Sequence, residues 1–225
     1  MISLLAAPRP HGSVPARVSA CRRNRTTSMN RIASRRPSRT EFTSDYHEGL
    51  IEQVQGECVL AALDRQLFWL CELASHLSTE QIDKIHPPYG WTVRQVFEHC
   101  ADAERVFGYR MLRLAAGDST PLPGWSENDY ADARFGLGTF SGLVSEIGQL
   151  RQANVNLLRR ILPQAWDRAA EVDGGRINVR AIAWVAAGHL QHHLRIVEKR
   201  CGISLPCSDG SAASTDSDPA GPAAT

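Results

Sequence analysis

Apolar side chains recur at helical spacing in four segments of the chain, which cover about residues 57–77, 92–116, 141–162 and 178–200. The two clearest stripes fit a period of 3.6 residues. They consist of Leu60, Leu63, Leu67, Leu70 and Leu77 in the first segment and of Leu143, Ile147, Leu150, Leu157 and Ile161 in the third. No stretch of useful length alternates apolar and polar residues as a half-buried strand does. The pattern therefore predicts an all-α protein built as a four-helix bundle.

Residues typical of helix ends delimit two of these segments. Thr92 followed by Gln95 forms a capping box, in which both side chains satisfy free backbone N–H groups of the first turn. Gly117 is placed to end this second helix, and Asn178 and Gly202 are placed to begin and end the fourth.

The connection between the second and third helices is long for a bundle. It covers residues 118–138, whereas helix connections in bundles usually have about two to eight residues. It contains Trp125 and Tyr130, so we expect it to be ordered against the helices. Two interpretations are open at this point: a packed crossover, or a lid over a functional site.

The two ends of the chain differ in composition from its centre. Residues 1–40 contain nine arginines, no acidic residue and few large apolar ones, which predicts a disordered arm. Residues 204–225 are rich in Ser, Ala, Asp, Gly and Pro, which predicts a disordered tail. The bundle is then expected at residues 41–203. Alternatives for the arm are a start placed too far upstream, with Met29 as the initiator, and a targeting or nucleic-acid-binding segment.

Charge and cysteine usage narrow the class of protein. Outside the arm the chain carries 16 basic and 24 acidic side chains, which argues against a nucleic-acid-binding surface on the bundle. No run of 18 apolar residues occurs, so we expect no contact with a membrane. Six cysteines without a C-x-x-C pair favour free thiols in a reducing cytoplasm over a disulfide framework or a zinc finger.

The histidines carry the strongest indication of chemistry. His189 and His193 stand four residues apart in the fourth helix and therefore project from one face. His99 lies on the inward side of the second helix. A single inward histidine is more often a hydrogen-bonded core residue than a ligand. Burying three imidazoles without a shared partner is costly, however, so together they predict a metal site.

Other polar residues near these positions have weaker interpretations. Asp102, three residues after His99, is a candidate to accept the second ring N–H of that ligand, or else a solvated carboxylate beside Arg105. Cys100 points away from the ligand face and is expected in the core. Arg180 stands near a helix N-terminus, where the dipole disfavours cations, which indicates an anionic partner from the protein or a substrate.

Three further polar residues occupy positions that indicate a partner or a location. Arg94, also near a helix N-terminus, is expected to have an anionic partner. His192 lies about 100° round the helix from His193 and is expected at the surface or behind the ligands. Asn154, on the inward stripe of the third helix, is expected to hydrogen-bond near the site or to a loop.

The chain resembles the DinB-like superfamily, including its YfiT-like members, from about residue 41 to residue 202. The motifs that carry the resemblance are residues 90–99 (GWTVRQVFEH), 102–107 (DAERVF), 117–124 (GDSTPLPG) and 178–181 (NVRA), with His189 and residues 192–194 (HHL) in the fourth helix.

The resemblance implies an up-down-down-up bundle with one divalent metal ion. The ligand positions of the family correspond to His99, His189 and His193, and zinc, nickel, iron and manganese all occur at such sites. Many members are homodimers, and some transfer low-molecular-weight thiols. Leu190 departs from the pattern, because relatives often carry a glutamate there.

The leading hypothesis is a metal-dependent transferase that acts on a small-molecule thiol. A metal-dependent hydrolase is the first alternative, and a non-catalytic metal- or ligand-binding bundle is the second. Three neutral ligands leave a metal ion open coordination positions, which both catalysis and simple binding need. In the catalytic hypotheses Asp102 orients a ligand and Arg180 holds a substrate anion. A third alternative makes the arm a nucleic-acid contact and the bundle a dimerising body.

Overall fold

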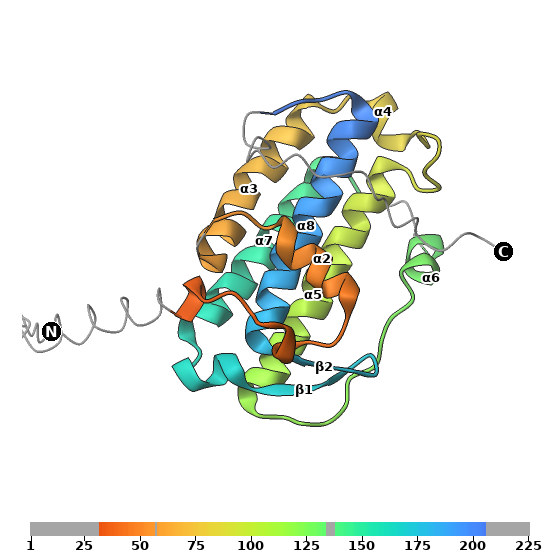
Figure 1. Cartoon of the computed structure of the whole chain (residues 1–225). Helices are drawn as coiled ribbons and strands as arrows, with labels where there is room; N and C mark the ends of the chain where they lie inside the picture. The colour runs from red at the N-terminus through yellow and green to blue at the C-terminus, as the bar shows by residue number, and fades with distance from the viewer. Residues whose placement is uncertain (1–31, 57, 134–137, 206–225) are drawn as a thin grey trace, which may run out of the picture.

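The four predicted helices form the body of the structure, a computed structural model that describes residues 32–56, 58–133 and 138–205 (Figure 1). These helices are α3 (Val59–His76), α5 (Val93–Ala116), α7 (Phe140–Arg160) and α8 (Val179–Cys201). Short elements join or flank them: η1 (Arg39–Glu41), α4 (Thr79–Asp83) and η2 (Pro163–Asp167). The predicted four-helix bundle is confirmed. Within the described ranges, no helix has the length and apolar character needed to cross a lipid bilayer.

Local hydrogen bonds set the helix ends that the sequence predicts. The Thr92 hydroxyl accepts the backbone N–H of Gln95 at 3.1 Å, and the Gln95 side chain accepts that of Thr92 at 2.9 Å. Gly117 ends α5 in the left-handed conformation with φ 87°. The Asn178 side chain accepts the N–H of Ala181 at 2.8 Å and begins α8. Each cap satisfies backbone groups that the helix itself leaves unpaired.

Helices α5 and α7 run parallel, although they follow each other in the chain. Near their N-terminal ends, the Phe97 and Phe140 rings lie 4.8 Å apart. Further along both helices, Glu104 forms an ion pair with Arg151 at 2.5 Å. Because the contact positions advance together in the two helices, their directions are the same.

Helices α3 and α8 form a second parallel pair. Gln66 donates a hydrogen bond to Gln191 at 3.3 Å, and Trp69 donates one to Glu198 at 2.9 Å. The two pairs run in opposite directions (Figure 1), which gives the up-down-down-up arrangement.

The parallel arrangement explains the long connection after α5. The chain must return along α5, whose 24 residues span about 36 Å, before α7 begins. Residues 118–133, which include α6 (Glu127–Asp132), make this return beside α5 (Figure 1). The Leu122 N–H donates to the Glu171 carbonyl at 3.0 Å and fixes the start of the return. The crossover interpretation is therefore confirmed.

Besides the short helices α4 and α6, one longer helix of the described chain was not predicted. Helix α2 (Asp45–Gln53) packs on α8, and of its nine residues only Leu50 and Ile51 are buried, too few to form a stripe. Its approach depends on Gly188, because a Cβ at that position would lie 2.1 Å from the Leu50 carbonyl oxygen. Helix α2 can therefore lie this close to α8 only where α8 has no side chain.

The expectation that the chain contains no strand is wrong for residues 169–178. Strands β1 (Ala169–Val172) and β2 (Gly175–Asn178) form an antiparallel hairpin at one end of the bundle (Figure 1). Its turn is Asp173-Gly174, with φ of 53° and 71°. Asp-Gly is a strong hairpin signal because both turn residues need positive φ. Each strand has only four residues, too few for an alternating pattern to indicate a strand.

The packed region extends beyond the expected limits of 41 and 203 at both ends. Ala33 is fully buried, Arg35 pairs with Glu41 at 2.8 Å, and Leu205 is buried in the core. The boundary expected at residue 40 therefore lies too late in the chain. Residues 1–31 and 206–225 lie outside the described residues, so the disorder expected there stays a prediction.

Arg36 fastens the end of α2 to the bundle. Its guanidinium donates to the carbonyls of Ile51, at 3.1 Å, and Val54, and lies 4.4 Å from the centre of the Trp184 ring. We expect Arg36→Ala to lower the free energy of unfolding by about 1–2 kcal/mol, since it removes hydrogen bonds and a cation–π contact. Chemical denaturation measures this loss.

Arg159→Ala is the matched control for Arg36, because Arg159 forms an exposed ion pair with Asp64. Exposed pairs contribute about 0.2–1 kcal/mol, so this variant should change stability less. Equal losses in the two variants would show that Arg36 acts only as a surface charge.

The core consists of two apolar clusters, one towards each end of the bundle. Between them, all four long helices contribute buried polar side chains. These are Gln66, His99, Glu104, Arg151, Asn154, His189 and Gln191. The middle of the bundle is therefore a polar layer, and the candidate chemistry lies in it.

Candidate metal centre

The structure brings the three predicted histidines together between α5 and α8. The Nε2 atom of His189 lies 2.9 Å from Nε2 of His99 and 3.2 Å from Nε2 of His193. One nitrogen from each of the three rings falls within 4.8 Å of the other two. His99 and His189 are buried and His193 is partly buried. The spacing of four residues in α8 and the packing of α5 against it produce this convergence.

The donor set fits a divalent metal ion. A neutral imidazole has one protonated nitrogen and one lone pair, so three mutually facing ring nitrogens cannot all satisfy one another by hydrogen bonds. Ligands about 2.0–2.1 Å from one ion are separated by about 2.9–3.4 Å for octahedral or tetrahedral angles. The observed separations of 2.9 and 3.2 Å agree with this range.

The protonation state of two of these histidines also suits metal ligands. Burial lowers the pKa of His189 and of His193 well below the ordinary value, and repulsion from neighbouring histidines and arginines lowers it further. These imidazoles are therefore neutral at neutral pH, which is the form that binds metal.

Aromatic side chains hold the ligand rings in place. Trp125, from the return segment 118–133, stacks on His99 with the ring centres 5.4 Å apart and the planes within 6°. Trp91 packs against the same imidazole at 5.3 Å, and Phe107 packs edge-on against His189 at 5.4 Å. The return segment thus lies against His99 as well as connecting two helices, so the two interpretations of this segment are compatible.

Asp102 lies one turn after His99 on α5 and beside Arg105, as its second interpretation expected, but it is less solvated than that interpretation described. Its carboxylate is 3.7 Å from Arg105, and only 15% of the side chain is exposed. A role in orienting His99 stays a prediction.

The structure does not bring Arg180 to the histidines. Its guanidinium is buried and pairs with Glu41 at 2.9 Å and with Asp167 at 2.5 Å. It precedes His189 by nine residues, about 13 Å along the helix axis. The anionic partners expected for Arg180 are thus protein carboxylates, and these contacts leave the proposed role in substrate binding without support.

Two of the remaining polar residues have protein partners. Arg94 donates to Asp83 at 2.6 and 3.0 Å, the anionic partner that its position indicated. Asn154 donates to the Glu104 side chain and backbone, both at 2.9 Å. Both side chains therefore support the bundle.

The two neighbours of the ligands also occupy the positions expected for them. His192 packs edge-on against His193, with ring centres 5.2 Å apart and partial exposure. Cys100 is buried in the core, and burial raises the pKa of its thiol. Neither side chain belongs to the three-histidine cluster.

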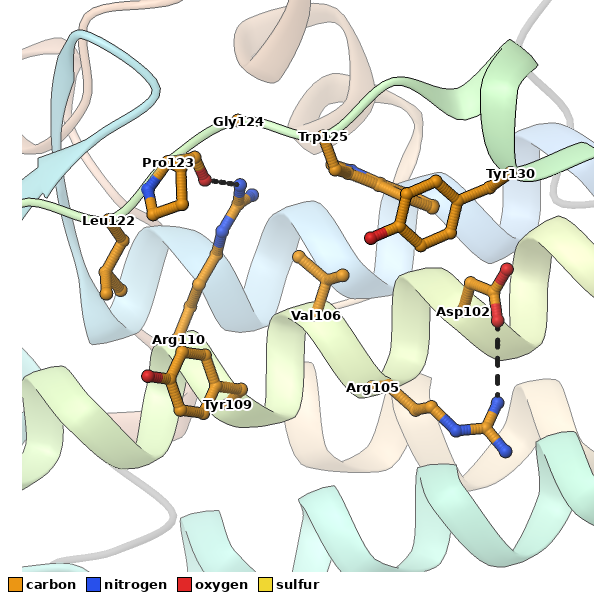
Figure 2. Close-up of a pocket in the computed structure, with 10 residues that line it drawn as sticks. All are labelled: Asp102, Arg105, Val106, Tyr109, Arg110, Leu122, Pro123, Gly124, Trp125 and Tyr130. Atoms are coloured by element: carbon orange, nitrogen blue, oxygen red, sulfur yellow. Dashed lines mark hydrogen bonds and ion pairs between the residues drawn. The ribbon is translucent and has the colours of Figure 1, made fainter. Parts of the chain in front are cut away.

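A cavity of about 360 Å³ adjoins the cluster, between α5 and the return segment (Figure 2). Trp125 separates the two, because it lines the cavity and stacks on His99. None of the three histidines lines the cavity. Its walls are Asp102, Arg105, Val106, Tyr109 and Arg110 from α5, and Leu122, Pro123, Gly124, Trp125 and Tyr130 from the return segment.

Sequence reasoning missed the ion pair that lies in the same layer as the histidines. Arg151 is fully buried, pairs with Glu104 at 2.5 Å and donates to Gln66 at 2.8 Å. A signal was available, because Arg151 continues the apolar stripe four residues after Ile147. An arginine at such a position requires a buried partner on a neighbouring helix.

Comparisons with known proteins agree with this arrangement. A family model described as the DinB superfamily matches residues 62–197. A protein of Oceanobacillus iheyensis, named as a candidate metal-dependent hydrolase, is 29% identical over 127 residues, which are 56% of this chain and 73% of that protein. The solved structure of YfiT from Bacillus subtilis, described as a candidate metal-dependent hydrolase with an unusual four-helix bundle topology, aligns with a TM-score of 0.59 and 20% identity. The alignment covers 79% of this chain and 99% of YfiT.

Proposed function

The chain belongs to the DinB superfamily, and we propose that it is a metal-dependent enzyme in which His99, His189 and His193 hold one divalent ion. The convergence of their three Nε2 atoms is the observation that carries this proposal. An all-imidazole ligand set suits zinc, nickel or iron better than manganese, which prefers oxygen ligands.

The reaction that we propose first is hydrolysis, which the names of two similar proteins support. Three neutral ligands leave a divalent ion its full charge and open coordination positions, so that it lowers the pKa of a bound water or thiol. Thiol transfer is the second candidate, because the borderline metals that imidazoles select also bind thiolates.

The protein itself positions the ligands and restricts solvent. Trp125 and Trp91 both pack against the His99 ring, and Trp125 brings the return segment onto this side of the site. Leu190 is apolar and buried, so a proton acceptor has to come from elsewhere. Asp102, one turn after His99 on α5, is our candidate for a residue that positions His99. A homodimeric assembly and a cytoplasmic location are further proposals.

The test is a comparison of two assays on the metal-loaded full chain. One follows hydrolysis of p-nitrophenyl esters and amides, and the other follows transfer of bacterial thiols to monochlorobimane. We expect metal-dependent turnover in one assay and a loss of about 100-fold or more in His193→Ala, since metal-ion catalysis contributes several kcal/mol.

His192→Ala is the matched control, because His192 adjoins the ligands without belonging to their cluster. It should retain turnover to within a few-fold. Turnover that is equal in wild type, His193→Ala and metal-stripped protein would contradict the proposal. The assay that shows metal-dependent turnover decides between hydrolysis and thiol transfer.

A further inference from the structure

The cavity beside the metal centre combines apolar walls with Arg110, a cation whose hydrogen bond goes to a neutral backbone carbonyl. Val106 and Leu122 supply aliphatic surface, and Trp125 and Tyr130 close one end with ring centres 5.2 Å apart. The volume of about 360 Å³ lies at the lower end of the range of small-molecule pockets, about 300–1,000 Å³. The shape and size therefore suit a small, flat, largely apolar molecule.

Charge distinguishes the ends of this cavity. Asp102 and Arg105 face each other at 3.7 Å, and Arg105 also pairs with Glu146 outside the cavity. These charges compensate one another within the protein. The end of the cavity near the metal centre therefore carries no unpaired positive charge.

Arg110 is the cation of the other end. Figure 2 shows its side chain extending from α5 to the Pro123 carbonyl, to which it donates at 3.1 Å. Among the described residues no carboxylate forms an ion pair with Arg110. Asp173 is near enough to raise its pKa, but burial lowers that pKa by more. An arginine held in this way favours a bidentate anion, because its planar donors match a carboxylate.

We propose that this cavity binds a small planar carboxylic acid, with the carboxylate on Arg110 and the apolar body between Val106 and the Trp125 and Tyr130 rings. Arg110, Val106 and Asp102 are spaced one turn apart along α5. The cavity therefore extends from Arg110 towards the metal centre over about 12 Å. A molecule anchored at Arg110 has its opposite end at Trp125, the ring that stacks on His99. The site is separate from the three histidines, so the proposal does not depend on the proposed function.

Calorimetric titration of the full chain with 2-naphthoate and 2-naphthamide tests the proposal, since these probes share a body and differ in charge. We expect the Kd of 2-naphthoate to be at least about tenfold lower than that of 2-naphthamide, because the amide cannot form the charged hydrogen bond to Arg110. The same difference is expected after removal of metal with a chelator. Loss of naphthoate binding in metal-free protein would place the carboxylate at the metal and overturn the proposal, as would equal binding of the two probes or no binding of either.

Variants locate the site. Arg110→Met should raise the Kd of 2-naphthoate about tenfold and leave that of 2-naphthamide unchanged, whereas Arg110→Lys should lie between wild type and Met. Val106→Trp should fill the cavity and abolish binding of both probes. Arg159→Met removes an arginine from an exposed ion pair on α7 and should have no effect. Naphthoate binding that survives both Arg110→Met and Val106→Trp contradicts the assignment. If Arg110→Met does not fold, Val106→Trp and the comparison of the two probes still decide.

Discussion

Replacing His189 with alanine is expected to leave the purified protein almost without bound metal. Four-ligand zinc sites have apparent binding free energies of about 10–16 kcal/mol, or about 2.5–4 kcal/mol for each ligand. Loss of one ligand should therefore weaken binding about 100-fold or more. His189 is the best residue for this test, because its Nε2 lies within 3.2 Å of both other ligand nitrogens. Elemental analysis after dialysis, together with competition by a chelator of known affinity, measures the effect.

His192→Ala provides the control for this experiment as well. His192 is in the same helix, three residues from His189, and packs against His193 without offering a nitrogen to the cluster. It should retain about one ion per chain. Added metal should raise the melting temperature of wild type and of His192→Ala but not of His189→Ala, because only a ligand that binds the native state stabilises it. Stoichiometric metal in His189→Ala would rule out the three-histidine site.

The helix ends were predictable because they depend on neighbours in the chain. Thr92 and Gln95 satisfy each other's backbone groups within one turn, and Gly117 tolerates the positive φ that ends α5. The pair His189 and His193 was predictable for the same reason, since a spacing of four residues fixes a common face. Its convergence with His99 depends on how α5 packs against α8. The inward position of His99 and the family resemblance both indicated this, whereas the spacing in α8 alone did not.

Features that depend on contacts between distant segments were missed. Helix α2 lies on α8 because Gly188 has no side chain, and no pattern within the nine residues of α2 records this. Arg180 looked like a candidate for substrate binding because its partners, Glu41 and Asp167, come from other parts of the chain. In both cases the residues that decide the structure are more than ten positions away.

The partners within the polar layer of the core also could not be predicted from the sequence. Gln66, Glu104 and Arg151 each occupy an inward position among apolar neighbours, and each taken alone resembles an isolated polar residue in a stripe. Only the assembled bundle shows that they satisfy one another. Their position between the two apolar clusters places them in the layer that also contains the histidines.

Arg151→Met is expected to cost about 3–5 kcal/mol of stability, because it leaves the Glu104 carboxylate buried without its counter-charge. Glu104 is 3% and Arg151 0% exposed, so water cannot replace the lost partner. The melting temperature should fall by about 6–20 °C, at about 2–4 °C for each kcal/mol in a domain of this size. The exposed pair of Arg159 with Asp64 is the reference, and Arg159→Met should cost about 1 kcal/mol or less.

A double-mutant cycle separates the ion pair from simple loss of packing. Glu104→Leu should also be strongly destabilising, because it leaves the Arg151 guanidinium buried without its carboxylate. The double variant Glu104→Leu/Arg151→Met removes both charges. Its loss in free energy of unfolding should therefore be smaller than the sum of the two single losses, by about 2 kcal/mol or more. Urea denaturation of the four proteins gives this coupling energy. Additive losses would mean that the two charges do not depend on each other, and a loss in Arg151→Met no larger than in Arg159→Met would mean that the pair is accessible to water. A large coupling, by contrast, makes the Glu104–Arg151 pair a rigid support at the level of the three histidines, where the positions of the ligands have to be kept.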